Sequence, residues 1–282
     1  MALEIKKLSN LMGAEATGVD LCKPISSTEA AKLNDALHEN IVLCIRNQNL
    51  DGPRFVEACK VFGNLMRQVN EELCDPDLPE LGNVTSGDVD RHDTKARVVR
   101  GTSWHSDHSF TEKPPSASIL YAVKLPSRGG NTSFCNLRAA YNALPDEKKK
   151  QLQGLKARHQ FRCSRAPNHI FIKLKNEADR IGAYIFPHPL VRQHLPTGEK
   201  TLYLNPQRME DIIGLERKDS DALLDELVAH SESPAFHWDH QWQAGDMLVW
   251  DNRCSMHHAN DDWPVNEERF LYKCIVEGEV PV

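Results

Sequence analysis

The chain has 282 residues, 40% of them hydrophobic and 26% charged, with a formal net charge of −6 and no basic run. This length is ample for one core, and the acidic balance argues against nucleic acid or an anionic membrane as a partner. No stretch approaches the roughly 18 apolar residues of a membrane-spanning helix, and the amino terminus lacks a signal-peptide pattern, so we expect a soluble, cytoplasmic protein.

The amino-terminal part of the chain is predicted to begin with helix, strand and helix. Residues 29–40 place apolar side chains at helical intervals, and the run IVLCI at 41–45 is typical of a buried strand. Pro53 opens a second predicted helix that continues to Phe62, because a proline in the first turn replaces an N–H that has no helical partner there.

The remainder of the chain is predicted to be mainly strand. Short aromatic or β-branched segments bounded by turn residues predict strands at 116–125, 236–242, 247–250 and 270–276. Helical patterns at 138–155 and 220–230 interrupt these strands. Many short strands with a few helices favour a mainly β fold with flanking helices (α+β), a sandwich or barrel, over an alternating parallel α/β sheet.

The sequence contains no repeat, low-complexity tract or linker, so residues 1–282 are predicted to form a single domain. Residues 76–100 show little hydrophobic periodicity and lead directly into the tetrapeptide WHSD at 104–107. Long irregular loops inside a compact domain are often lids or binding loops. We therefore expect the segment 76–100 to act as a lid over an active site.

The WHSD tetrapeptide carries the first candidate for a metal site. In an extended strand, residues i and i+2 point to the same face, so His105 and Asp107 can bind one ion together. The alternative is an exposed histidine beside a capped turn, and the spacing alone does not decide between the two. A third ligand must come from elsewhere, and the carboxy-terminal turn that leads to His257 and His258 offers candidates.

Five ordered motifs then make a family resemblance specific. They are WHSD, PSRGGNTSF at 126–134, HPLVRQHLPTGEKTLYLN at 188–205, WDNRCSMH at 250–257, and Arg269. In order and spacing they resemble the taurine dioxygenase and 2,4-dichlorophenoxyacetate dioxygenase family, non-haem iron enzymes that depend on 2-oxoglutarate. The resemblance covers nearly the whole chain and implies a double-stranded β-helix (jelly roll) core.

The resemblance also implies the ligands of the metal and of the cosubstrate. His105, Asp107 and His257 match the family's iron ligands, and His258 is expected on the opposite side of its segment. Two imidazoles and one carboxylate leave three coordination positions open, which suits Fe(II) in oxygenases. Arg269 matches the arginine that grips the distal carboxylate of 2-oxoglutarate, and Thr132 matches the hydroxyl that helps to hold it.

The reaction implied is the use of O2 to decarboxylate 2-oxoglutarate to succinate and CO2 while a small-molecule substrate is hydroxylated. Cleavage follows if the oxidised carbon bears a heteroatom. The carboxylate of Asp107 argues against a halogenase, because halogenating relatives lack this ligand so that chloride can bind the metal.

Substrate recognition is where this sequence departs from its relatives. Lys273 stands where the family commonly has a second arginine, so the site keeps a positive charge but loses the forked guanidinium, and a small anion remains the expected substrate. Phe161 is a candidate wall of the pocket. Gln68 and Arg208 stand near family substrate contacts, although a solvated polar side chain explains either of them equally well.

Two alternatives stay open at this stage. One is a biosynthetic enzyme of the same family that performs desaturation or oxidative rearrangement, and the other is a metal-binding jelly roll that binds 2-oxoglutarate without catalysis. The resemblance further implies a homo-oligomer, either a dimer or a tetramer.

Overall fold

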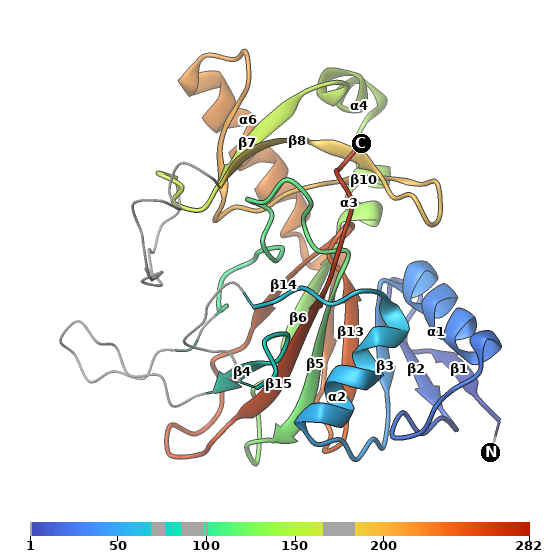
Figure 1. Cartoon of the computed structure of the whole chain (residues 1–282). Coiled ribbons are helices and arrows are strands. Elements are labelled where there is room, and N and C mark those ends of the chain that lie inside the picture. Colours follow the sequence, from blue (N-terminus) through green and yellow to red (C-terminus); the bar gives the residue numbers. More distant parts are fainter. Residues whose placement is uncertain (1, 69–76, 86–98, 100, 166–183) are drawn as a thin grey trace.

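A computed structural model describes residues 2–68, 77–85, 99, 101–165 and 184–282. Its largest sheet has seven strands in the order β1-β2-β3-β13-β5-β15-β4, and only the β2–β3 pair is parallel. The strands are β1 (Glu4–Lys7), β2 (Ala14–Thr17), β3 (Val42–Ile45), β13 (Met247–Asp251), β5 (Ala117–Lys124), β15 (Phe270–Val276) and β4 (Gly82–Thr85). Strands from both ends of the sequence therefore lie side by side (Figure 1).

Two helices, α1 (Ser27–Asn40) and α2 (Gly52–Cys59), cover one face of this sheet (Figure 1). A capping box starts α1, because the Ser26 hydroxyl accepts the Glu29 backbone N–H while the Glu29 carboxylate accepts the Ser26 N–H. The 3-10 turn Lys60–Phe62 follows α2 directly. Helix α1 confirms the helix predicted at 29–40, and α2 with this 3-10 turn confirms the helix predicted at 53–62.

The central strands of the large sheet are buried on both faces. Along β13, Met247 and Val249 join the core beneath the helices, whereas Leu248 and Trp250 join a second core on the other side. Side chains alternate along a strand, so an unbroken apolar run is what a strand with two covered faces requires.

A three-stranded sheet covers that second core. Its order is β12-β6-β14, formed by β12 (His237–His240), β6 (Thr132–Asn136) and β14 (Ser255–Ala259). Phe134 of β6 and Trp250 of β13 meet between the two sheets, with ring centroids 5.6 Å apart. Two facing antiparallel sheets of this kind form the predicted jelly roll.

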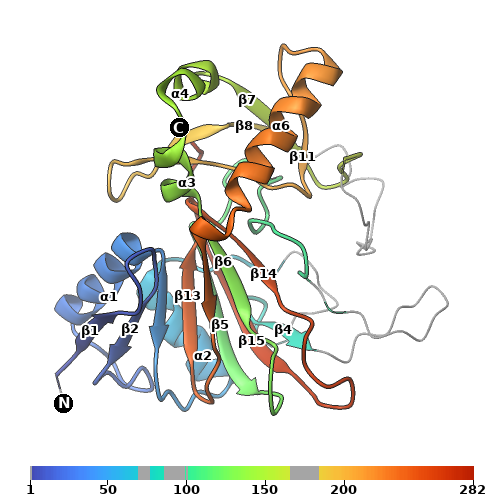
Figure 2. The same cartoon turned by 180° about the vertical axis from the view of Figure 1, so that it is seen from behind.

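The remaining elements form a third packed region above the jelly roll (Figure 2). They are the sheet β11-β7-β8, the hairpin β9-β10 and three helices around a separate apolar core. Their bounds are β7 (Lys156–Gln160), β8 (Ile185–Pro189), β9 (Val191–Gln193), β10 (Lys200–Leu202), β11 (Met209–Ile212), α3 (Leu137–Ala143), α4 (Asp146–Leu152) and α6 (Arg217–Ser231).

Most predicted elements are confirmed, and two need correction. The helix expected at 138–155 is two helices, because Pro145 disfavours helical backbone at Leu144, whose φ of −66° and ψ of 144° are extended. The segment 76–100 is not irregular throughout, since residues 82–85 form β4. Its residues 76, 86–98 and 100 lie outside the described residues, so the predicted lid stays a prediction.

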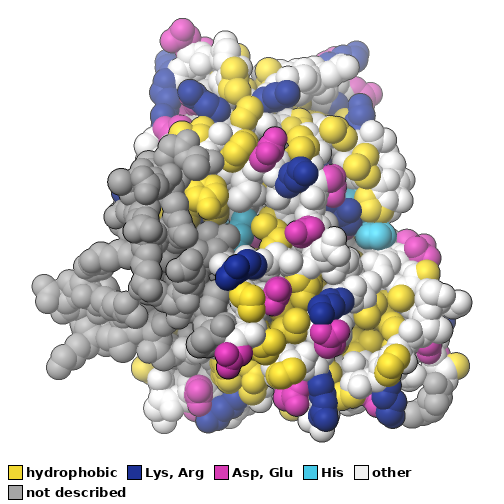
Figure 3. Space-filling model, viewed as in Figure 1, with side chains coloured by type: hydrophobic (Ala, Val, Ile, Leu, Met, Phe, Trp, Pro, Cys, Tyr) yellow, Lys and Arg dark blue, Asp and Glu magenta, His cyan; other side chains and the backbone are white. Residues whose placement is uncertain are grey.

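Within the described ranges, no helix is long and apolar enough to cross a membrane. The face of the molecule in Figure 3 carries acidic and basic side chains intermingled with apolar ones, without a basic stripe among its described residues. The expectation that nucleic acid is not a partner, drawn from the net charge of −6, stays a prediction.

Candidate active site

The three predicted metal ligands lie together between the two sheets of the jelly roll. His105 Nε2 is 3.9 Å from Asp107 Oδ1, and His257 Nε2 is 4.0 Å from Asp107 Oδ2. Residues 105 and 257 form a reciprocal backbone bridge, with N···O distances of 3.1 and 2.9 Å. This bridge joins the WHSD segment to β14 and holds the two imidazoles close together, with ring centroids 4.2 Å apart and the ring planes 44° apart.

The backbone also fixes which nitrogen of His105 is able to bind a cation. His105 Nδ1 lies 2.8 Å from the Ser103 carbonyl oxygen, which is only an acceptor, so Nδ1 carries the hydrogen and Nε2 presents its lone pair. Burial lowers the pKa of His105 and holds the pKa of His257 well below its usual value. Both rings are therefore neutral at pH 7, as metal ligands must be.

Asp107 is buried and supported by two donors. The Ser118 hydroxyl donates to Oδ2 at 2.6 Å, and Lys273 Nζ lies 3.0 and 2.9 Å from Oδ1 and Oδ2. Burial opposes ionisation, but the Lys273 ammonium outweighs it and the pKa of Asp107 is well below its usual value. One anionic oxygen donor and two neutral nitrogen donors, all within 4.8 Å of one another, fit a divalent transition metal.

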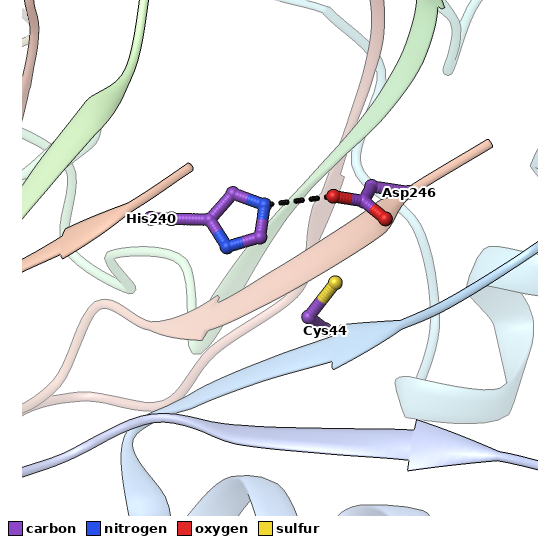
Figure 4. Close-up of side chains that lie close together, drawn as sticks. All are labelled: Cys44, His240 and Asp246. Carbon is purple, nitrogen blue, oxygen red and sulfur yellow. Dashed lines mark hydrogen bonds and ion pairs between the residues drawn. The ribbon is translucent and has the colours of Figure 1, made fainter. Parts of the chain in front are cut away.

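Two other groups of potential ligands occur among the described residues. Cys44 of β3, His240 of β12 and Asp246, which directly precedes β13, converge (Figure 4). Asp246 Oδ2 already accepts hydrogen bonds from Arg46 at 2.7 Å, His240 at 3.1 Å and the Gln243 backbone. Burial also raises the pKa of the Cys44 thiol, which disfavours the thiolate that a metal needs. This group is therefore a hydrogen-bonded brace between β3 and β13.

The second group, His194, Asp251 and Cys254, is equally enclosed. The Asp251 carboxylate accepts two hydrogen bonds from Arg253, at 2.9 and 2.6 Å, and one from His194 Nε2 at 2.9 Å. An arginine already neutralises this carboxylate, and all three residues have no exposed surface. The His105 side chain, in contrast, is 20% exposed, so the first triad is the one that small molecules reach.

The predicted cosubstrate residues also come together. Arg269 is buried, its Nε donates to the Gly130 carbonyl at 2.9 Å, and its guanidinium lies between Trp242 and Trp263 at 5.9 and 5.5 Å from the ring centroids. Trp242 Nε1 in turn donates to the Thr132 hydroxyl at 3.1 Å. Burial lowers the pKa of Arg269 to about 10, so it remains a cation at pH 7.

The predicted substrate residues divide into two groups. Lys273 Nζ donates to the Asp107 carboxylate. The Arg208 guanidinium lies over the Phe161 and Phe110 rings, at 4.9 and 5.2 Å from their centroids, and donates a hydrogen bond to the Phe161 carbonyl. Burial lowers the pKa of Arg208, and the Asp107 carboxylate acts against this shift. Gln68 instead donates through Nε2 to the backbone carbonyls of Glu80 and Lys273, which ties the segment before β4 to β15.

Two further residues, His108 and Gly101, lie at the triad. His108, next to Asp107, has a φ of 44° and a buried Nδ1 without a hydrogen-bond partner among the described residues, and burial lowers its pKa to about 4. Gly101 has a φ of +75°, and a Cβ there would lie 3.2 Å from His105 Cε1. The sequence alone does not indicate the buried position of His108 or the close approach of Gly101 to His105, because both depend on the folded structure.

Comparisons with known proteins identify the family. Residues 4–275 match the family model described as taurine catabolism dioxygenase TauD, TfdA family. An alpha-ketoglutarate-dependent 2,4-dichlorophenoxyacetate dioxygenase of Burkholderia sp. (strain RASC) is 32% identical over 92% of this chain and 89% of its own length. Alpha-ketoglutarate is a synonym of 2-oxoglutarate.

Solved structures agree with this match. A putative alpha-ketoglutarate-dependent taurine dioxygenase from Burkholderia xenovorans has a TM-score of 0.84 and 32% identity, covering 100% of this chain and 91% of its own. AAD-2 in complex with Mn(II) and N-oxalylglycine has a TM-score of 0.82 and 27% identity, covering 100% and 99%. The chain belongs to the TauD/TfdA family of 2-oxoglutarate-dependent non-haem dioxygenases. The predicted family and fold class are confirmed.

Proposed function

We propose that this enzyme uses Fe(II), O2 and 2-oxoglutarate to hydroxylate a small organic anion. The observation that carries the proposal is the convergence of His105, Asp107 and His257 within 4.8 Å, with His105 held in the tautomer that presents Nε2. When bound, Fe(II) activates O2, so that one oxygen atom enters succinate as CO2 leaves and the other enters the substrate hydroxyl.

In this proposal Arg269 and Thr132 hold the distal carboxylate of 2-oxoglutarate. A buried guanidinium between two indole rings is a dry cationic pocket that a carboxylate fits through paired hydrogen bonds. The hydrogen bond from Arg269 Nε to Gly130 sets the plane of that guanidinium. These residues orient the cosubstrate, which leaves the face beside Lys273 and Arg208 for the primary substrate.

The charges around the triad support an anionic primary substrate. Lys273 and Arg208 are two cations near one carboxylate, Asp107, and an ammonium has three donors of which Asp107 uses two. The third donor of Lys273 is assigned to a carboxylate, sulfonate or sulfate of the substrate. Phe110 and Phe161, stacked against Arg208, supply apolar walls for the rest of the molecule.

Succinate release tests the proposal. The Fe(II)-loaded enzyme, 2-oxoglutarate and a panel of aryloxyalkanoates, sulfonates, sulfate esters, phosphonates and amino acids are compared for substrate-dependent succinate formation. Asp107→Ala and His105→Ala are expected to abolish it, whereas His258→Ala, which changes the neighbouring histidine whose ring lies against Trp104 at 4.4 Å, is expected to retain it. Turnover that survives Asp107→Ala, or 2-oxoglutarate binding without turnover of any panel member, would contradict the proposal.

The role of Lys273 has its own test. Lys273→Met should raise the KM for the anionic substrate while the affinity for 2-oxoglutarate stays unchanged, because the two carboxylates are assigned to different cations. Equal loss of both would show that Lys273 acts only through Asp107.

A further inference from the structure

A closed ring of hydrogen bonds connects the Asp107 carboxylate to its own backbone amide. The Ser118 hydroxyl donates to Asp107 Oδ2 at 2.6 Å, and Asn252 Nδ2 donates to the Ser118 oxygen at 2.8 Å. Asn252 Oδ1 accepts the Asp107 backbone N–H at 3.4 Å. Ser118 and Asn252 are essentially fully buried, so water does not replace these contacts.

The direction of each hydrogen bond in this ring is determined by chemistry. Asn252 Oδ1 receives two N–H groups, from the Asp107 backbone and from Trp250 Nε1 at 3.2 Å, and an N–H is only a donor. The amide oxygen must therefore face them, and the NH2 must face Ser118. The Ser118 oxygen accepts the hydrogen bond from Asn252. Its single hydrogen is donated to the Asp107 carboxylate, because an ionised carboxylate only accepts.

The ring also reaches a second ligand of the triad. Trp250, which donates to Asn252, packs its indole against the His257 imidazole with ring centroids 4.6 Å apart. Ser118 lies on β5, whereas Trp250 and Asn252 lie at the end of β13 and in the turn after it. Residues of the large sheet therefore hydrogen-bond to Asp107. The Trp250 indole both donates to Asn252 and packs against the His257 ring.

We propose that Ser118 and Asn252 are positioning residues that orient the Asp107 carboxylate toward the metal. The inference rests on the ligand set of the proposed function and assigns a role to two residues that touch neither metal nor substrate. Ser118 holds Oδ2 in addition to the Lys273 ammonium that contacts both oxygens, so rotation of the carboxylate about its Cβ–Cγ bond is restricted and its oxygens keep one orientation relative to the two imidazole nitrogens. Outer-sphere partners of this kind change metal affinity by about 10- to 100-fold when removed.

Mn(II) affinity of the full-length protein tests the inference without any substrate. Free Mn(II) is measured by electron paramagnetic resonance during titration, and thermal unfolding of each metal-free variant is recorded beside it. Ser118→Ala and Asn252→Asp, which keeps the amide's shape but replaces its donor by an acceptor, should each raise the Mn(II) Kd about tenfold or more. Asn252→Asp keeps an oxygen for the Asp107 N–H, and the lost NH2 reaches the Asp107 carboxylate only through Ser118, so the double variant should lose no more affinity than Ser118→Ala alone.

Two matched controls come from the same chain. Ser220 is a fully buried serine whose hydroxyl accepts the Ile212 N–H, and Asn136 is a buried asparagine with one donated and one accepted hydrogen bond, to Leu11 and from Ala139. Ser220→Ala and Asn136→Asp should leave the Mn(II) Kd unchanged even where they lower the unfolding temperature.

The outcomes separate this inference from the proposed function. If Asp107→Ala keeps the wild-type Kd, the ligand set itself is wrong. If Asp107→Ala loses Mn(II) but Ser118→Ala or Asn252→Asp weakens binding less than tenfold, the positioning role is overturned. It is also overturned if the controls weaken binding equally, or if the losses in the double variant add.

Discussion

Replacing Arg269 by lysine is the sharpest test of the cosubstrate pocket. The substitution keeps the positive charge and most of the apolar stem but removes the planar fork. In the structure the Nε of Arg269 is committed to the Gly130 carbonyl at 2.9 Å, which aims the two terminal nitrogens in a fixed plane. A lysine has one nitrogen, which is unable to bond Gly130 and grip a carboxylate through two parallel hydrogen bonds at once.

The size of the effect follows from the hydrogen bonds lost. A bidentate arginine–carboxylate pair becomes at best one ammonium contact, so one charge-assisted hydrogen bond, worth about 1.5–3 kcal/mol, disappears. At about 1.4 kcal/mol for each factor of ten, the Kd for the cosubstrate rises roughly 10- to 150-fold. Metal affinity should not change, because Arg269 lies among Trp242, Trp263 and Gly130 rather than on a triad side chain.

Isothermal titration of Mn(II)-loaded protein with N-oxalylglycine, a mimic of 2-oxoglutarate, measures this directly. Arg138→Lys is the matched control, since Arg138 is also a buried arginine but bonds Glu199 and the Glu39 carbonyl. An Arg269→Lys protein that binds N-oxalylglycine within threefold of wild type, or that loses Mn(II) as well, would refute the assignment of this pocket.

Three further outcomes concern stability. Asp251→Asn should lower the free energy of unfolding in urea by about 3–5 kcal/mol, because it leaves the buried Arg253 cation without its carboxylate; a loss below about 1 kcal/mol contradicts this. Burial lowers the pKa of His188 to about 4, below the 6.5 of an unfolded chain, so the unfolded state gains the extra proton as the pH falls between these values. The free energy of unfolding should therefore decrease by about 3 kcal/mol as the pH falls from 6.5 to 4. In His188→Gln, the free energies measured by urea titration should lack this part of the pH dependence. His108 adopts a φ of 44°, so His108→Val should destabilise by about 1–3 kcal/mol whereas His108→Gly should not; equal urea midpoints for the two variants would show that no strain is stored there.

The convergence of the candidate ligands His105, Asp107 and His257 could be predicted from the sequence because these residues occur in short motifs. His105 and Asp107 lie two residues apart, and His257 follows Trp250 by seven, so a family resemblance is enough to find them. Two strands close to this site, β6 and β14, were harder to recognise. Strand β6 (TSFCN) is buried along its whole length yet contains polar residues. Strand β14 (SMHHA) lacks the alternation of apolar and polar residues that indicates a strand.

The supporting contacts could not be predicted in the same way. Ser118 and Asn252 meet across 134 positions of sequence, and each reads as an ordinary strand or turn residue. Gln68 is a further example, because the sequence does not indicate that its amide donates to two backbone carbonyls; its contact with substrate stays a prediction. Which polar groups meet depends on sheet register, and a single sequence does not contain that information.

The bridge between residues 105 and 257 has a consequence for how the protein is made. In the proposed ligand set, His105 and Asp107 leave the ribosome first, and His257 emerges only later, with β14. A polypeptide lacking that strand has too few donors to bind the ion firmly, so in this ligand set the metal site is complete only after β14 has been synthesised. A bound ion would link the segment 105–107 to β14 and would stabilise the native state, because it binds the folded protein and not the unfolded chain.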